Sequence, residues 1–498
     1  MSQKKVGLIL SYITLLASSV LAIVLTPFML RSLGAVEYGL YQSISSFIGV
    51  LAVLDFGTGI TATKNISELR LRGDKEGESN YLATQMIINV IIAIIILVIG
   101  VIFAFSVDTI FQKGFSEGEL SKARLLAFLY VINVIVTMFG NTFQGVITGY
   151  QKFAVSNAFS LGKILVRFLL IFILLSLGMD SIAISIADIV ATSAFTIVCM
   201  IYVIPGLKVR ILLKKLDMNL FLSTMAFSAA LFLQTIVNQI NNSIDKVLLG
   251  ALMGGVAVTL YSVAMSVYLI YGSLSGAVRN IMLPDAVKLI NNNATGDEIT
   301  SFVIKGGRFQ FAVLGYILFG FILVGKEFIY LWVGDGYEVS WYITMILMVP
   351  TLFQLSTNIS ETILDAMGKR MIRSVILLTG ALFNLAMTIV LVKKMGVIGA
   401  PIATAVSSII FGLVILNIYH KKVMNLNVKR MFIEICSKTT GILVVSFFVA
   451  YLSNLLKLSI FIMLLVKGLI FSIVYFGLMI KIGFNAEEKQ MVFSRVKR

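Results

Sequence analysis

The sequence has few charged residues for its length. Asp, Glu, Lys and Arg make up 13% of its 498 residues, whereas an ordinary soluble domain contains roughly 25%. Hydrophobic residues make up 59%, and the mean hydropathy is +0.99. This balance excludes a soluble globular protein and indicates an integral membrane protein.

Cysteine and histidine are scarce, which excludes several kinds of site. Cys199 and Cys436 are the two cysteines and lie far apart, so neither a disulfide framework nor a CxxC metal site is expected. His420 is the single histidine, and one histidine is a weak basis for a metal site or for acid-base catalysis. We therefore expect no metal, no resident cofactor and no catalytic residues, as in a transporter rather than an enzyme.

Apolar runs of about 20 residues recur along the chain, and each is long enough for a helix to cross a bilayer. We predict an all-α integral membrane protein with about fourteen transmembrane helices. The predicted spans are residues 6–30, 38–62, 80–106, 124–149, 153–177, 181–204, 220–245, 247–278, 302–324, 339–364, 371–393, 396–419, 434–456 and 459–481.

The net charge is +16, and the basic residues are unevenly placed. Most of them fall in loops on one side of the predicted membrane, such as 64–79, 207–219 and 279–308. Basic loops stay in the cytoplasm, so both termini are predicted to be cytoplasmic. We interpret the charge as topology and attraction to anionic lipids, and not as nucleic-acid binding, because no solvated basic domain is present.

An internal repeat predicts the domain organisation. Residues 148–202 align with 365–419 without a gap, and "SLGAVEYGLY" (32–41) aligns with "LMGGVAVTLY" (252–261). Each half has an even number of spans, so both halves enter the membrane in the same direction, and the substrate path of such parallel repeats runs between them. The predicted divisions are an N-lobe of six spans (1–206), a linker (207–219), a C-lobe of six spans (220–420), and two further spans with a basic tail (421–498).

Four predicted spans carry a polar stripe at the 4-3-4 spacing that places residues on one helix face. Such a stripe either hydrogen-bonds neighbouring helices or lines a wetted cavity, where amides suit a hydroxyl-rich ligand such as a sugar. We favour the cavity. The candidate sugar-binding residues are Asn141, Gln144, Gln234, Asn238, Asn241, Gln354 and Asn358.

Two cations, Lys163 and Arg167, lie near the middle of the fifth span. Each costs roughly 2.5–3.5 kcal/mol at a helix centre, and snorkelling explains Arg167 poorly. Ion pairing with Asp55, Asp188 or Glu361 is the structural alternative. We favour an anionic ligand, because both side chains suit phosphate oxygens.

Acidic residues within the spans are candidates for ion pairs or for a coupling ion, Na⁺ or H⁺. They are Asp55, Asp188, Glu361 and Asp365. Because Asp55 precedes two nearby glycines, it is also a candidate for capping a helix break.

Six segments carry a resemblance to a known family. They are "TPFMLRSLGAVEYGLYQ" (26–42), "LDFGTGITATKNISE" (54–68), "VITGYQKF" (146–153), "NSIDKVLLGALMGGVAVTLYSVA" (242–264), "GKEFIYLWVGDGYEVS" (325–340) and "MGVIGAPIATAVSSII" (395–410). With these segments the sequence resembles the bacterial polysaccharide flippases, which move undecaprenyl-pyrophosphate-linked oligosaccharides and belong with the multidrug/oligosaccharidyl-lipid/polysaccharide exporters.

The resemblance implies two six-helix lobes around a central cavity, two extra C-terminal helices and alternating access. It also implies a bacterial cytoplasmic membrane protein for surface polysaccharide (O-antigen or capsule type), whose cavity cations attract the substrate's pyrophosphate. The expected partners are the lipid-linked oligosaccharide, membrane lipids, and a polysaccharide polymerase and glycosyltransferases, with the protein itself a monomer.

Other functions compete with this interpretation. A lipid II-type flippase shares the architecture and an anionic carrier. A drug exporter of the same superfamily would need acidic groups facing a cationic drug, whereas the deepest charges here are basic. A membrane polymerase or ligase belongs to another class, and the paired halves and short outer loops count against it.

Overall fold

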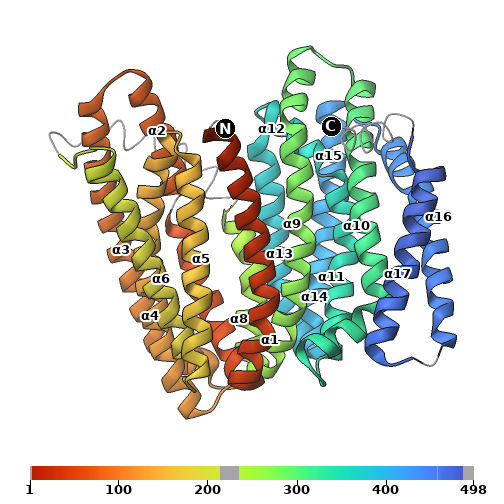
Figure 1. The fold of residues 1–498 in the computed structure, drawn as a ribbon, viewed down its shortest axis with the longest axis horizontal. Helices are drawn as coiled ribbons and strands as arrows, with labels where there is room; N and C mark the ends of the chain where they lie inside the picture. The colour runs from red at the N-terminus through yellow and green to blue at the C-terminus, as the bar shows by residue number, and fades with distance from the viewer. Residues whose placement is uncertain (1–2, 56, 213–234, 457, 486–498) are drawn as a thin grey trace. The chain divides into compact units, whose positions relative to one another are not determined.

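The computed structural model describes residues 3–55, 57–212, 235–456 and 458–485, in which every regular element is helical (Figure 1). Eleven helices of this part are long and apolar enough to cross a membrane. The all-α membrane fold predicted from hydropathy is therefore confirmed. Most of the seventh predicted span, including Gln234, lies outside the described residues.

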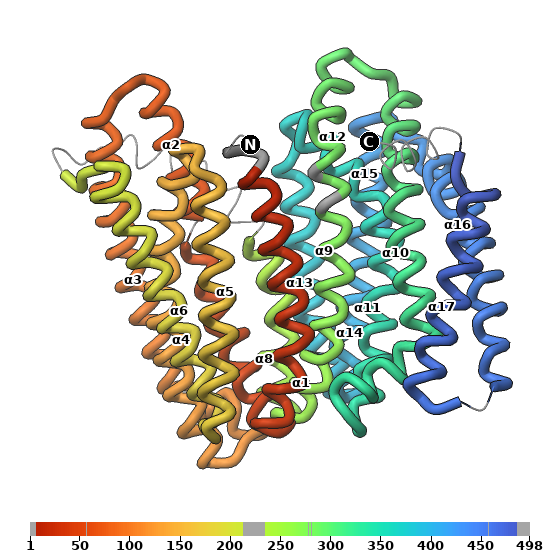
Figure 2. The backbone as a smooth tube through the Cα atoms, viewed as in Figure 1, coloured from red at the N-terminus to blue at the C-terminus, as the bar shows by residue number. Residues whose placement is uncertain are grey.

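The chain forms two compact units, unit 1 (Met1–Ser262) and unit 2 (Val263–Arg498), which the tube in Figure 2 traces from red to blue. The lobe boundaries inferred from the repeat stay a prediction. Unit 1 contains α1 (Gln3–Leu51), η1 (Ala52–Asp55), α2 (Thr58–Leu71), α3 (Lys75–Phe111), α4 (Glu117–Gly149), α5 (Phe153–Ser176), α6 (Ile182–Ile201), η2 (Tyr202–Gly206), η3 (Ile240–Ile244), α8 (Asp245–Met253) and the start of α9 (Gly255–Asn291).

Unit 2 continues along α9 and ends in the two helices predicted as spans 13 and 14. Its further elements are α10 (Gly296–Val333), α11 (Glu338–Thr357), α12 (Ile359–Ala366), α13 (Arg370–Met395), η4 (Gly396–Ile398), α14 (Gly399–Ser407), η5 (Ser408–Ile415), α15 (Leu416–Met424), α16 (Val428–Tyr451), η6 (Leu452–Leu455), α17 (Ile460–Leu478) and η7 (Met479–Gly483).

Helix α1 contains the first predicted span and residues 38–51 of the second, joined by a kink at Gly34, where φ is +78°. The repeat aligns Gly34 with Gly254, whose φ is +83° and which separates α8 from α9. In the same register, Gly73 (φ +68°) falls on Asn293 (φ +52°). Left-handed backbone is rare outside glycine and asparagine, so its recurrence at aligned positions supports the repeat independently of sequence identity.

The second aligned segment shows the same recurrence. Gln151 (φ +57°) falls on Gly368 (φ +70°), and just past the segment Lys208 (φ +59°) falls on Asn425 (φ +50°). The non-glycine residues with positive φ in the described part of the chain are Gln151, Lys208, Asn293 and Asn425, and each takes part in one of these matches. The two halves therefore turn the chain in the same way at matching points.

Three predicted spans are divided by breaks in the structure. The predicted span 38–62 is divided by η1 and Gly57, between α1 and α2. The predicted span 247–278 is broken by the left-handed Gly254, and the helix that follows, α9, runs on to Asn291 through a stretch predicted as loop. The predicted span 339–364 is interrupted at Asn358, between α11 and α12. Hydropathy averages over the breaks at Gly254 and Asn358 because neither is accompanied by polar loop residues.

Small residues let helices of unit 1 approach closely. A Cβ atom on Gly145 of α4 would lie 2.3 Å from the carbonyl oxygen of Gly59 on α2. The same contact lets the Thr63 hydroxyl donate to the carbonyl of Gly145 at 3.1 Å. Such packing of small residues is typical of membrane helices, where lipid offers no hydrophobic drive for association.

An ion pair connects α17 to α10 in unit 2. The Lys467 ammonium lies 2.7 Å from Glu327, and Lys467 is buried. This pairing explains a lysine in the last predicted span. Pairing removes most of the cost of a charge in an apolar environment.

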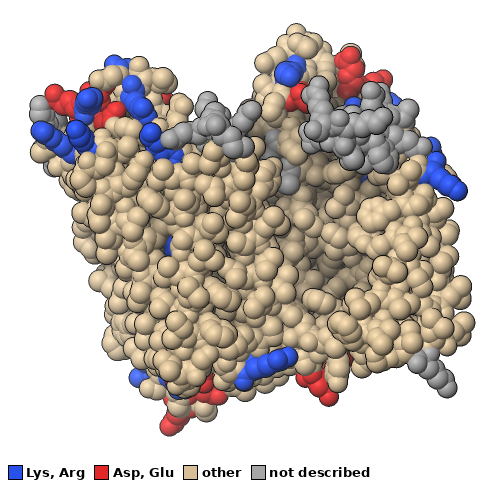
Figure 3. All heavy atoms as spheres, in the orientation of Figure 1, with Lys and Arg blue, Asp and Glu red and all other residues tan. Residues whose placement is uncertain are grey.

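Charged side chains on the visible face gather at the ends of the helices, and the faces between are almost entirely uncharged (Figure 3). Many large apolar side chains of the long helices are exposed, among them Leu16, Ile102 and Phe448. An exposed apolar band between charged ends is the surface expected of a protein that spans a bilayer.

We expect Gly255→Ala to lower the free energy of unfolding by about 1–3 kcal/mol, the usual cost of overpacking. A Cβ there would lie 2.3 Å from the carbonyl oxygen of Val36 on α1, and backbone cannot move aside cheaply. Thermal melting of the purified protein in detergent measures the effect. Gly272→Ala is the matched control in the same helix, because a Cβ there meets nothing within 4 Å. Equal melting temperatures for the two variants would contradict the close contact.

Candidate functional site

The polar stripes of α4 and α5 face each other in unit 1. The Gln144 amide donates to Ser160 at 2.7 Å and to Ser156 at 3.2 Å, and the Thr148 hydroxyl donates to Ser156 at 3.4 Å. At this point the stripes hydrogen-bond two helices together, which is the alternative to cavity lining.

Arg167 forms an ion pair with Asp188 of α6. Its Nε donates to one carboxylate oxygen, and its Nη2 lies 3.5 Å from the other. The Tyr130 hydroxyl donates to Asp188 at 3.2 Å. Asp188 is buried, so the charge of Arg167 is largely balanced within unit 1.

Lys163, one helical turn before Arg167, has no such partner. Its ammonium lies 5.3 Å from the centre of the Phe195 ring, and it forms no ion pair with any residue that the structure describes. A cation–π contact stabilises an ammonium by only about 0.5–2 kcal/mol. Lys163 and Arg167 together therefore carry one more positive charge than the carboxylate beside them neutralises.

An amide contact recurs at matching positions in the two units. In unit 1, the Asn141 amide donates to Asp55 at 3.0 Å, and the Thr58 hydroxyl also donates to Asp55. In unit 2, the Asn358 amide donates to Ser275 at 2.9 Å. The alignment of 148–202 with 365–419, extended upstream, places Asn141 on Asn358. The alignment of 32–41 with 252–261, extended downstream, places Asp55 on Ser275. One half of the repeat thus has a carboxylate where the other has a hydroxyl.

Asp55 also ends the short helix η1 at the break before α2, where Gly57 has φ +69°. Its carboxylate accepts from Thr58, the first residue of α2. The residue therefore lies at the helix break, but Gly57 is the N-cap of α2 and no side-chain capping hydrogen bond is made there, so a capping role for Asp55 stays a prediction. Thr58 and Asn141, which donate to its carboxylate, are both neutral.

The described end of the seventh predicted span has accessible amide side chains at a π-helical turn. Asn238 is exposed, Asn241 is half-buried, and both precede or lie in the π-helical turn Ile240–Ile244. Asp245 is fully buried and accepts from the Tyr261 hydroxyl at 2.6 Å. Single π-turns within α-helices occur frequently at functional sites, and accessible amides beside one suit a polar ligand.

The remaining predicted amide, Gln354, is half-buried and accepts from the Ser408 hydroxyl at 2.6 Å. Of the predicted sugar-binding residues, Asn141, Gln144, Asn238, Gln354 and Asn358 have interaction partners. Asn238 is the exposed one among those described.

Sequence reasoning missed three arginines that surround Glu361 and Asp365. Arg373 lies 3.2 Å from Glu361 and 3.3 Å from Asp365. Arg279 lies 3.4 Å from Glu361, and Arg370 lies 3.9 Å from Asp365. Arg279 falls in the predicted basic loop 279–308, and Arg370 and Arg373 lie at the start of the predicted span 371–393, where basic residues are common. Two carboxylates one turn apart in an apolar span were the signal that cations had to lie nearby.

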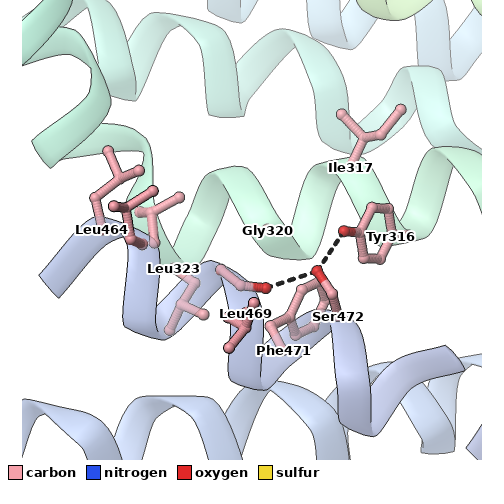
Figure 4. A pocket seen from close by; sticks show the side chains of 11 residues that line it. Tyr316, Ile317, Gly320, Leu323, Leu464, Leu469, Phe471 and Ser472 are labelled. Carbon is pink, nitrogen blue, oxygen red and sulfur yellow. Dashed lines mark hydrogen bonds between the residues drawn. The ribbon is translucent and has the colours of Figure 1, made fainter. Parts of the chain in front are cut away.

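A cavity of about 490 Å³ lies between α10 and α17, and Figure 4 shows its lining. The Tyr316 and Ser472 hydroxyls lie 2.7 Å apart there, and the other lining residues are apolar or glycine. This cavity offers no charged group to a phosphate. Over residues 3–55, 57–212, 235–456 and 458–485, no three His, Cys, Asp or Glu side chains are arranged to hold a metal ion.

Long apolar helices with ionised groups between them define a multi-pass integral membrane protein. Residues 5–278 match the family described as "Polysaccharide biosynthesis protein". The match covers more than half of the chain, which belongs to this family.

Several proteins of known description are similar to the chain. It is 22% identical over 385 residues to the "Probable low-salt glycan biosynthesis flippase Agl15" of Haloferax volcanii, covering 76% of each chain. The solved structure of the lipid II flippase MurJ, in an inward closed conformation, matches with a TM-score of 0.73 at 16% identity, covering 99% of this chain and 100% of that one. An inward-facing multidrug resistance MATE family transporter of the MOP superfamily matches with a TM-score of 0.66 at 14% identity, covering 83% and 94%. The fold is thus one shared with MurJ and the MATE transporters.

We expect Arg167→Gln and Asp188→Asn to destabilise the protein singly more than in combination. Each single change leaves one charge without its partner, whereas the double variant removes both. Because Arg167 is one-third exposed, the coupling energy should be about 1–3 kcal/mol. Thermal melting of the four proteins in detergent measures it, and additive effects would show that the pair does not stabilise unit 1.

Proposed function

We propose that this protein is a flippase that moves a lipid-linked oligosaccharide across the membrane, from the inner to the outer leaflet. Lys163 is the observation that carries the proposal, because it is a half-buried cation on the polar face of α5 with no carboxylate partner among the described residues. Such a charge is costly unless a ligand uses it. Membership of the polysaccharide biosynthesis family supports a glycan as the cargo.

The substrate's phosphate is proposed to contact Lys163 first. Arg167 is engaged by Asp188, and its role is to add positive potential while its own guanidinium stays oriented by that pair. An undecaprenyl-pyrophosphate carrier would supply the anion. The charge excess of one at this locus attracts the carrier without holding it so tightly that release stalls.

The sugar portion is proposed to contact accessible amides, with Asn238 and Asn241 favoured by their exposure. Amides offer both donors and acceptors, as hydroxyl-rich ligands require. Asn141, Gln144, Gln354 and Asn358 would exchange their present helix contacts for sugar contacts only if those helices move. Alternating access by the paired halves supplies such movement in proteins built from repeats.

A coupling ion, Na⁺ or H⁺, is proposed to act at Asp55. Asp188, Glu361 and Asp365 have arginine partners, whereas the described hydrogen-bond partners of Asp55, Thr58 and Asn141, are neutral. A carboxylate with neutral partners gains most from binding a cation.

The proposed substrate is a repeat unit of O-antigen or capsule type. The proposed location is a bacterial cytoplasmic membrane, with both termini in the cytoplasm. The protein would act as a monomer between glycosyltransferases that build the unit and a polymerase that consumes it. A lipid II-type flippase is the second candidate, and the similarity in fold to MurJ is the observation that favours it.

We expect Lys163→Gln to reduce glycan export at least tenfold in cells that depend on this protein, because the charge contact with phosphate is lost. Surface glycan, measured at matched protein level, checks this. Lys326→Gln is the control, since Lys326 also lies over an aromatic ring, 4.7 Å from the centre of that of Trp341, but is exposed. Full export by Lys163→Gln would remove the basis of the proposal.

Deletion of the gene separates a flippase from a polymerase. Without a flippase, single lipid-linked repeat units should accumulate on the inner leaflet, where soluble enzymes added to intact cells cannot reach them. Accumulation on the outer leaflet would indicate a polymerase or ligase. The chemical identity of the accumulated unit distinguishes an O-antigen or capsule repeat from lipid II.

A further inference from the structure

An ionic cluster joins α9, α12 and α13 at one end of unit 2. The Glu361 carboxylate accepts from Arg279 at 3.4 Å and from Arg373 at 3.2 Å. One turn along α12, Asp365 lies 3.3 Å from Arg373 and 3.9 Å from Arg370. Arg373 lies between the two carboxylates and is 2% exposed.

The cluster contains more positive than negative charge. Among the described residues, Arg279, Arg370 and Arg373 face Glu361 and Asp365, which leaves an excess of one positive charge in this part of the chain. Arginine does not lose its proton in proteins. The side chains of Arg279 and Arg370 are 37% and 40% exposed. The buried arginine therefore bridges the two acids, while the two outer arginines can each reach a further anion.

Helix packing does not require these charges, because unit 1 does without them. The repeat alignment places Glu361 on Gln144 and Arg373 on Ser156, and these two neutral residues hydrogen-bond at 3.2 Å. It likewise places Asp365 on Thr148, whose hydroxyl donates to Ser156. The same helix contact is thus made by neutral groups in one half and by ions in the other.

The start of α13 adds further positive potential. Arg370 is its first residue, and Lys369 at the cap makes no side-chain capping bond and is exposed. The first amide groups of a helix point toward an anion, and the helix dipole favours one there. The Arg370 Nε has no hydrogen-bond partner, although the atom itself is buried.

We propose that Arg279, Arg370 and the first turn of α13 form a binding site for a phosphate group within unit 2. Arginine forks match the oxygens of phosphate, and the excess charge of the cluster is balanced by a bound oxyanion. The phosphate belongs either to a membrane lipid headgroup or to a soluble phosphate, since both present the same oxygens. The site does not rest on the proposed function.

Two probes test the site on the purified full-length protein. The first is inorganic phosphate, titrated in nanodiscs of neutral phosphatidylcholine. The second is the lipid itself, as the rise in melting temperature when phosphatidylglycerol replaces part of the phosphatidylcholine. A phosphate response identifies a soluble ligand, and a response to phosphatidylglycerol alone identifies a lipid headgroup. Either result supports the site if the variants abolish it, and no response to either probe overturns it.

We expect Arg279→Gln and Arg370→Gln each to weaken binding about tenfold or more, the usual effect of losing one charged hydrogen bond. The ligand-free variants should melt within a few degrees of the unmodified protein, because Arg373 still pairs with both acids. Arg430→Gln is the control, which removes a half-buried arginine of unit 2 that is paired with Glu434.

Two results would overturn the site. One is a lower melting temperature of the ligand-free Arg279→Gln and Arg370→Gln variants with ligand affinity unchanged, which would show that the arginines serve packing alone. The other is an equal loss of affinity in Arg430→Gln, which would show that the protein responds to overall charge and not to these residues.

Discussion

An ionised side chain between lipid-facing helices has no water to solvate it, so its counter-charge must come from the protein or from a ligand. Arg167 with Asp188 and Lys467 with Glu327 show the first solution, each across two helices. Each pair restricts how its two helices rotate about their axes, because rotation would separate the charges. Lys163 has no carboxylate counter-charge among the described residues, which is why it is the candidate for binding an anionic ligand.

Comparison of the two halves of the repeat shows where their charged residues differ. Matching points of the two halves share unusual backbone conformations, so both halves solve the same folding problem. Their charges nevertheless lie at different points. Arg167 of unit 1 falls on Asn384 of unit 2, which hydrogen-bonds to Thr404 at 3.2 Å. Since neutral residues suffice for packing at the matching position, an ionic group there has been retained despite its desolvation cost.

The ionic groups of the two units therefore need a different explanation from the neutral polar residues around them. Amides such as Gln144 and Asn358 connect helices within one unit, and their hydrogen bonds account for their presence. The sequence pattern alone grouped them with Lys163 because all lie on polar faces. Only the partners of each side chain separate a helix contact from a group that is available to substrate.

Composition and hydropathy determined the membrane class, the all-helical fold and most span positions, because a bilayer requires about 20 apolar residues for each crossing. The internal repeat could also be inferred from aligned segments of the sequence. Tertiary structure decided the rest. The helix breaks at Gly254 and Asn358 have no polar loop to mark them, and the partner of Arg167 comes from a different helix. Residues distant in sequence, such as Arg279 and Glu361, meet only when helices pack, and a periodic pattern contains no information about which helix lies beside which.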